Sequence, residues 1–193
     1  MTSKLVTELV LREGLLPILT SREEGQRPAL ADVERIVDGC EILALGAAAH
    51  TARRRECSDE VRIYVPFAPA SNDAEILVLG QAVTLRGTAL LRHVAKERLL
   101  GPIGRRIVVD FGALGLEIAQ VALSFGATDL AGPIASRRGL AMIDDDPKKV
   151  VKRREIAGYV ERAGFRPVFV TTEARSDAAP ATTDAPARPH VDS

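Results

Sequence analysis

The sequence of 193 residues contains no tryptophan, two cysteines and three histidines. Neither sign of charge is in excess, because the 26 Lys and Arg residues are equal in number to the 26 Asp and Glu residues. Balanced charge gives no general attraction to nucleic acid or to an acidic membrane. Scarce aromatics argue against base stacking. No apolar run approaches the roughly 18–20 residues that span a bilayer, which excludes an integral membrane protein.

The N-terminal residues also lack the apolar core and the cleavage site of a secretory signal, so we expect a cytoplasmic protein. Cys40 and Cys57 are too few for a disulfide framework, which fits a reducing compartment. With His50, His93 and His190 they show no spacing typical of a zinc site. Motifs of the types G-x-S-x-G, H-E-x-x-H, P-loop and C-x-x-C are absent from the sequence.

Hydrophobic residues make up 46% of the chain, enough for one core. We divide the chain into three parts. Residues 1–28 are predicted to form an N-terminal helix over 3–13 and a polar loop over 20–28. Residues 29–173 form an α/β domain. Residues 174–193 are rich in Ala, Pro, Thr and Asp without apolar periodicity, which predicts a disordered tail.

Helical and strand patterns alternate along the central part. We expect helices over 29–38, 41–55, 88–99, 116–125 and 147–163, and strands over 62–66, 75–80, 106–111, 128–132 and 167–170. This alternation predicts βα units around a mostly parallel sheet, preceded by N-terminal helices. Basic residues over 148–154 are interpreted mainly as a solvated helix face, and Arg53–Arg55 suit a helix C-terminus.

One candidate site is the turn after the strand over 106–111. Gly112 and Gly115 could present backbone N–H groups to a phosphate, although the full G-x-G-x-x-G pattern is absent. An ordinary tight βα turn is the favoured alternative.

Further candidates follow at the strand ends. Asp110 and Asp129 occupy corresponding places on two expected strands. Two carboxylates at the same edge of the sheet could serve acid–base catalysis or bind a metal ion. A structural role for Asp129, bonding backbone N–H groups, is favoured. Ser136 and Arg137 follow the end of a strand, where they could bind an anion. A solvated loop without a ligand is the favoured alternative.

Two blocks of sequence carry a family resemblance. Residues 30–65 place LALGAAAHTARRR before the first strand, and residues 88–170 contain LGLEIAQVALSFGATDLAG and end in GYVERAGFRPVFV. Together, over roughly two thirds of the chain, they resemble radical S-adenosylmethionine (SAM) enzymes of the aminofutalosine synthase, dehypoxanthine futalosine cyclase and deazaflavin cofactor synthase type. The resemblance implies strands from a TIM-like barrel.

The chain differs from that family in the segment that carries out the family's reaction. The family's C-x-x-x-C-x-x-C loop should follow the first strand, but residues 66–73 read PFAPASND. A four-iron cluster that binds SAM needs those thiolates. The central barrel strands are also missing, and the family's acidic pair is replaced by Ala135-Ser-Arg-Arg138. We therefore expect a partial, half-barrel fold with neither an iron–sulfur cluster nor bound SAM.

The leading hypothesis is a non-catalytic partner or regulatory subunit, linked to menaquinone biosynthesis by the futalosine pathway. It would form a homo-oligomer or pair with a full-length radical SAM paralogue. The alternative is a small ligand-binding protein or enzyme without a cluster. Its site would comprise Asp110, Gly112, Gly115, Asp129, Ser136 and Arg137. A decaying gene fragment is a third possibility, disfavoured by the regular apolar periodicity.

Overall fold

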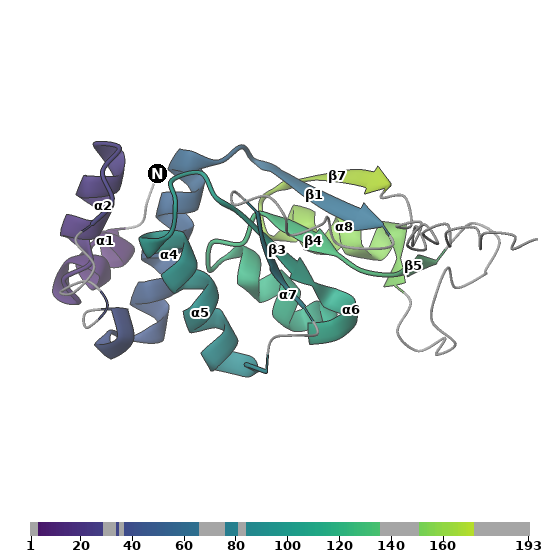
Figure 1. Cartoon of the computed structure of the whole chain (residues 1–193), viewed down its shortest axis with the longest axis horizontal. Coiled ribbons are helices and arrows are strands. Elements are labelled where there is room, and N and C mark those ends of the chain that lie inside the picture. Colours follow the sequence, from purple (N-terminus) through teal and green to yellow (C-terminus); the bar gives the residue numbers. More distant parts are fainter. Residues whose placement is uncertain are drawn as a thin grey trace, which may run out of the picture.

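The computed structural model describes residues 4–28, 34, 37–65, 76–80, 84–135 and 151–171 (Figure 1). Its helices are α1 (Lys4–Arg12), α2 (Leu16–Glu23), α4 (Ile42–Glu56), α5 (Gly87–Leu100), α6 (Phe111–Leu114), α7 (Leu116–Leu123) and α8 (Arg153–Arg162). Its strands are β1 (Glu60–Val65), β2 (Ile76–Leu79), β3 (Arg106–Asp110), β4 (Asp129–Ala131), β5 (Ile134–Ala135), β6 (Val151–Lys152) and β7 (Arg166–Thr171).

Five strands form one sheet in the order β2-β3-β4-β1-β7, and every neighbouring pair is parallel. This confirms the α/β class and the parallel sheet expected from the sequence. β5 and β6 form a separate pair of two-residue strands, which the sequence did not predict. The interior strand β1 pairs with β4 and β7, both far along the chain.

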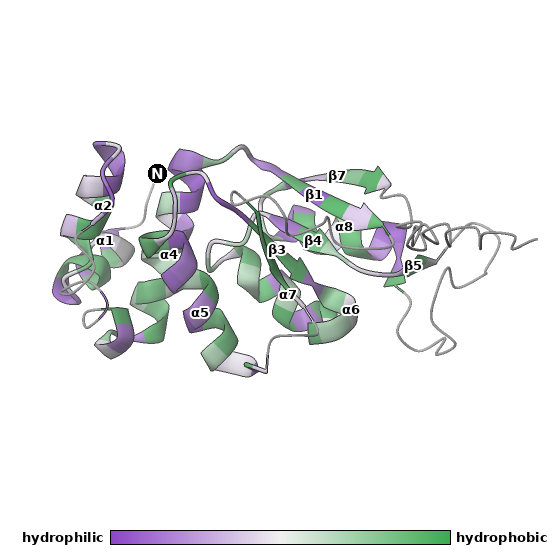
Figure 2. Ribbon diagram, viewed as in Figure 1, coloured by the Kyte–Doolittle hydropathy of each residue, from purple (hydrophilic) through white to green (hydrophobic). Residues whose placement is uncertain are grey.

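The two faces of the sheet differ in what covers them. On one face, Ile63, Ile107, Val109 and Leu130 join a large hydrophobic core with residues from α1, α2, α4, α5, α7 and α8. On the opposite face, a small cluster contains strand residues alone among those described: Tyr64, Val108 and Ala131, with Ile76, Val78 and Val170 beside them. The described helices therefore share one face of the sheet, and residues of both layers form the hydrophobic core between them. Figure 2 colours the ribbon of these helices and strands by the hydropathy of each residue.

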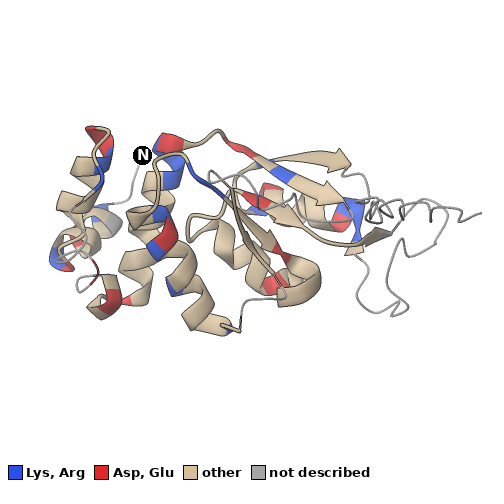
Figure 3. Cartoon of the chain, viewed as in Figure 1, with Lys and Arg blue, Asp and Glu red and all other residues tan. Residues whose placement is uncertain are grey.

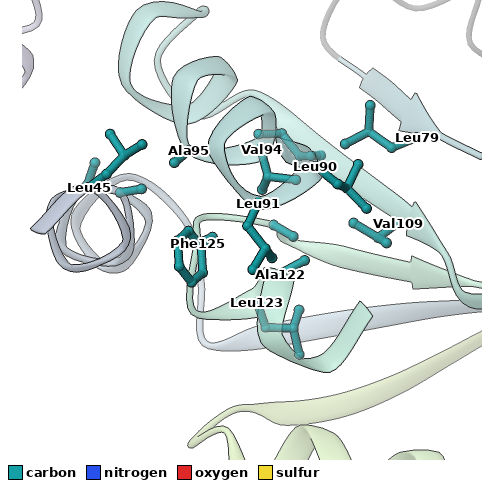
Figure 4. Close-up of a cluster of buried hydrophobic side chains, with 14 of the residues drawn as sticks. Leu45, Leu79, Leu90, Leu91, Val94, Ala95, Val109, Ala122, Leu123 and Phe125 are labelled. Carbon is teal, nitrogen blue, oxygen red and sulfur yellow. The ribbon is translucent and has the colours of Figure 1, made fainter. Parts of the chain in front are cut away.

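The main core is packed tightly where α4 and α5 meet α7. Leu45 of α4, Leu90 and Val94 of α5 and Leu123 of α7 are fully buried (Figure 4). The ring of Phe125 lies against α4 at Gly46, where an added Cβ would stand 2.9 Å from ring carbons. Helix α4 can approach this closely only because residue 46 has no side chain.

The N-terminal helices belong to the same core. Val10, Leu15, Ile18 and Leu19 are buried in it, and α1 and α2 lie on the outer side of α4 (Figure 1). The prediction of a loop from residue 20 is wrong for its first part, because α2 continues to Glu23. A proline in its first turn suits a helix start, since the missing N–H has no helical partner there.

A second correction concerns the helix predicted over 147–163. Val151 and Lys152 form β6 instead, and α8 begins at Arg153 after Lys152 in extended conformation (φ −75°, ψ 139°). The pairing of β6 with β5 holds this segment extended. Most of the helix expected over 29–38, and the tail over 174–193, lie outside the described residues. No described helix is long and apolar enough to cross a membrane.

Candidate functional site

Asp110 ends β3 and begins the turn expected to hold a phosphate. Its Oδ1 accepts hydrogen bonds from the backbone N–H groups of Gly112 (2.8 Å) and Ala113 (3.2 Å), so it caps the short helix α6. Burial raises the pKa of Asp110, and the two backbone hydrogen bonds oppose this rise. The N–H groups that would cradle an anion are therefore already occupied by this carboxylate.

The two glycines of this turn have packing and conformational roles. A Cβ at Gly112 would lie 2.7 Å from Cδ of Pro133, so only glycine fits. Gly115 has a φ of +94°, which favours glycine, and separates α6 from α7. These roles support the ordinary βα turn rather than a phosphate loop.

Asp129 does not occupy the position corresponding to Asp110. The register pairs Asp129 with Val108, and Asp110 with Ala131, so Asp129 lies two residues nearer the start of the strands. Both strand positions belong to the face opposite the helices, because Val108 and Ala131 lie in the small cluster there. The expected pair of carboxylates at one rim is therefore not formed.

Asp129 is buried, with 2% of its surface exposed, and is enclosed by hydrogen bonds. Arg106 donates to both of its oxygens, from Nε at 3.1 Å and from a terminal nitrogen at 2.8 Å. Thr128 Oγ1 donates at 2.6 Å and the backbone N–H of Arg62 at 3.3 Å. Arg106 also donates to the Tyr64 hydroxyl. This network joins β1, β3 and β4, which supports the structural role for Asp129.

Ser136 and Arg137 lie outside the described residues. Of the six predicted site residues, the structure brings Asp110 and Gly112 into contact, places Gly115 at the next helix, and sets Asp129 apart in its own ion pair.

A cluster of buried charged side chains that the sequence did not predict lies where α4 ends. Figure 3 marks the positions of Lys, Arg, Asp and Glu along the backbone. Arg22 and Glu56 form a two-bond ion pair, with Nε to Oε1 at 2.6 Å and a second nitrogen to Oε2 at 2.8 Å. Arg53 donates from Nε to the carbonyl of Ala127 at 2.9 Å, and Arg98 from Nε to that of Gly126 at 3.0 Å. We call these four side chains, Arg22, Arg53, Glu56 and Arg98, the buried charge cluster.

One signal for this cluster was present in the sequence. Arg53 follows Leu45, Ala49 and Ala52 on the apolar stripe of the helix, which places it toward the core. The run Arg53–Arg55 instead suggested only a favourable helix C-terminus. In the structure Arg53 is completely buried, and burial lowers its pKa to about 10. Arg54 pairs with Asp59, and Arg55 with Glu23, nearer the surface.

The two cysteines are separated by α4. Cys40 precedes this helix of 15 residues and Cys57 follows it, so the helix holds them apart by about 22 Å of axial rise. Within the described part of the chain, no group of three His, Cys, Asp or Glu side chains is arranged to hold a metal ion. In comparisons with known proteins, no family model matches the chain, and no curated protein is significantly similar to it.

Proposed function

We propose that the chain is a truncated relative of radical SAM enzymes of the futalosine and deazaflavin type, acting as a non-catalytic partner or regulatory subunit linked to menaquinone biosynthesis. The observation that carries the proposal is the order of the four strands β2, β3, β4 and β1 together with the single face that the helices cover.

In a closed βα barrel the last strand pairs with the first, and all helices lie outside. Here β2, β3 and β4 are neighbours in chain order, and β4 pairs with β1. These four strands have the order that remains when strands are removed from the middle of a barrel. β7, the last strand of the chain, departs from that order, because it pairs with the other side of β1, where a barrel places its second strand. Helices packed on one face correspond to the outside of such a barrel, so β2, β3, β4 and β1 with their helices support the half-barrel interpretation and β7 does not.

The positions of the cysteines support a non-catalytic role. A SAM-cleaving cluster would need three thiolates after β1, where residues 66–73 contain no cysteine. Cys40 and Cys57 precede β1 and stand at opposite ends of α4, so they cannot replace that set.

The edges of the sheet support a partner. β2 and β7 each have one strand neighbour within the described sheet. An open edge leaves backbone N–H and C=O groups available for another chain. A second copy or a full-length paralogue with a cluster would supply strands of matching geometry.

The test is an affinity purification of the tagged full-length protein from its native host, with bound proteins identified by mass spectrometry. The proposal expects a cluster-bearing relative or a stoichiometric second copy, and assays of any recovered relative with and without this chain define the regulatory effect. Purification of the isolated protein under anaerobic conditions with stoichiometric iron and sulfide would refute the proposal.

The ligand-binding alternative depends on Asp110. Its Oδ1 serves the α6 cap, while no described residue donates a hydrogen bond to Oδ2. A thermal-shift screen with nucleosides and SAM tests this alternative, because a ligand of the native state raises the melting temperature. A shift that disappears in Asp110→Asn would favour a site at this strand end over the subunit role.

A further inference from the structure

The connection from β1 to β2, residues 66–75, runs against the direction of the other connections in the five-stranded sheet. The connections from β2 to β3 and from β3 to β4 contain α5 and α7, and the one from β4 to β7 contains α8. All three move across the sheet from the β2 edge toward the β7 edge, whereas the connection from β1 returns past β4 and β3 to the β2 edge. Residues 66–75 themselves lie outside the described part of the chain.

The hand of these connections indicates which face the returning chain crosses. Crossovers between parallel strands are right-handed in about 98% of cases. The three connections that move toward β7 carry their helices on the same face of the sheet, so they share one hand. A connection that moves in the opposite direction has that same hand only if it passes over the other face. The rule therefore favours the face opposite the helices.

The length of the connection agrees with this path. Tyr64 lies level with Asp110 along the strands, and Ile76 lies level with Arg106. The two ends of the connection are thus separated by three strand spacings and about five residues of strand, which is roughly 22 Å in a direct line. Ten intervening residues reach at most about 36–40 Å. A detour over the helix layer adds at least two helix diameters of about 10–12 Å, which exceeds that reach.

The middle of the face opposite the helices is closed to solvent. Val108 and Ala131 are 0% exposed there and Tyr64 is 6% exposed, although their cluster contains strand residues alone among those described. Val78 and Val170, on the edge strands, are partly exposed. Side chains in the middle of a bare sheet would contact water, so their burial indicates that something covers β3 and β4, which the direct path crosses.

We propose that residues 66–75 cross and fill the sheet face opposite the helices. Their sequence, PFAPASNDAE, changes from apolar to acidic along the path. The apolar half follows the end of β1 and covers the cluster at β4 and β3. The acidic half brings Asp73 and Glu75 to the start of β2, whose first residue pairs in register with Arg106. Pro66 and Pro69 lack backbone N–H groups, so fewer donors lose their hydration on this face.

This placement depends on strand order, register, burial and chain length, and it holds whether or not the chain is a regulatory subunit. In the enzymes that the sequence resembles, the cluster cysteines stand in the segment after the first strand. Here the same segment fills the face that would lie inside a barrel. That face is then closed to a ligand and to a second copy, and a partner would pair with the edges at β2 and β7.

The first experiment uses the absence of tryptophan from the sequence. Phe67→Trp gives the full-length protein a single tryptophan, and Leu43→Trp is the control, because Leu43 is 67% exposed on α4. We expect acrylamide to quench the first variant several-fold less than the second when both are folded, and equally in urea. Equal quenching in the folded variants would overturn the proposal. Protection that is lost on dilution would also overturn it, because a second copy would then cover the segment.

The second experiment identifies the face by disulfide formation, which needs Cα atoms within about 7 Å. Ala68→Cys and Ala70→Cys are each combined with Ala131→Cys on the face opposite the helices, or with Val121→Cys, which is exposed on α7. Circular dichroism checks the fold, and peptide mapping separates these bonds from any bond of Cys40 or Cys57. We expect an intramolecular disulfide with Ala131→Cys, in several-fold higher yield than with Val121→Cys.

Three outcomes of the second experiment would overturn the proposal. A disulfide that joins two chains through Ala131→Cys would assign the face to a second copy. A bond that forms only with Val121→Cys would place the connection on the helix side. Absence of any bond with Ala131→Cys in the folded variants would show that the connection does not cross this face, as expected if it passes around the outer edge of β2.

Discussion

Glu56 is the carboxylate that forms the buried ion pair with Arg22, which joins α2 to the end of α4. Replacing it with Gln leaves the buried guanidinium of Arg22 without its ion pair. It also weakens the hydrogen bond from the backbone N–H of Gly104, 3.1 Å away. Breaking one side of a buried pair costs about 3–5 kcal/mol, so we expect Glu56→Gln to lower the free energy of unfolding by that amount in urea titrations.

Glu23→Gln is the matched control, because Glu23 pairs with Arg55 where both side chains are about half exposed. Exposed pairs contribute about 0–1 kcal/mol. Similar losses in the two variants would show that the Arg22–Glu56 pair is not the stronger interaction.

His50, on α4, makes stability depend on pH. Burial, assisted by Arg54 and Arg53, lowers its pKa below 6.5. The unfolded chain therefore binds this proton more readily than the folded one, so the free energy of unfolding falls as the pH drops through about 6.5. It levels off once the pH is below the pKa of His50 in the folded protein.

We expect His50→Gln to reduce this loss, measured by urea unfolding at pH values from about 7 to 5. His93→Gln, on α5, controls for removal of a histidine. An unchanged pH dependence in His50→Gln would contradict the assignment.

At the scale of elements, two mid-helix glycines give opposite predictions for the same substitution. Gly46→Ala in α4 places a Cβ 2.9 Å from the buried ring of Phe125 and should destabilise by about 1–3 kcal/mol. Gly158→Ala in α8 meets only the flexible end of Arg162 at 3.3 Å, and should stabilise by about 1 kcal/mol through helix propensity. Thermal unfolding of both variants tests this, and a stabilised Gly46→Ala would contradict the packing described.

Elements with clear apolar periodicity were predictable from the sequence. Helix α4 and strand β3 follow the expected ranges within one or two residues, because one buried stripe or one apolar run defines each. α2 was missed because its final turn is polar in sequence and resembles a loop, although Arg22 in that turn is buried. The start of α8 was misplaced because β6 depends on its pairing with β5, which no local pattern reveals.

The candidate site was less predictable than the fold. Spacing alone placed Asp110 at a strand end, but the partners of Asp129 come from β1, from β3 and from Thr128 just before β4, and they depend on register. Arg22, Glu56 and Arg98 are distant in sequence and meet only when α2, α4 and α5 pack together. Three-dimensional packing therefore had to be known before the buried charge cluster was visible.

On the scale of the whole molecule, residues 4–28 are part of the main hydrophobic core. Their four buried side chains, Val10, Leu15, Ile18 and Leu19, each contribute about 1.5–3 kcal/mol by burial. The sum is comparable with the total stability of a typical domain, about 5–15 kcal/mol. We expect a protein lacking residues 1–28 to be unfolded or aggregated by circular dichroism and size-exclusion chromatography, whereas one lacking residues 1–3 folds. A cooperatively folded 29–193 fragment would contradict this.

The interior position of β1, between β4 and β7, has a consequence for synthesis on the ribosome. Its residue Arg62 pairs with Asp129, 67 residues later, and Glu60 pairs with Arg166, 106 residues later. At about 5–20 residues per second, the strand emerges roughly 5–20 s before its last partner is made. Until β4 is made, Val61, Ile63 and Tyr64 have no neighbouring strand to pair with. Nascent chains are thus a natural substrate for a chaperone that shields an apolar strand until translation is complete.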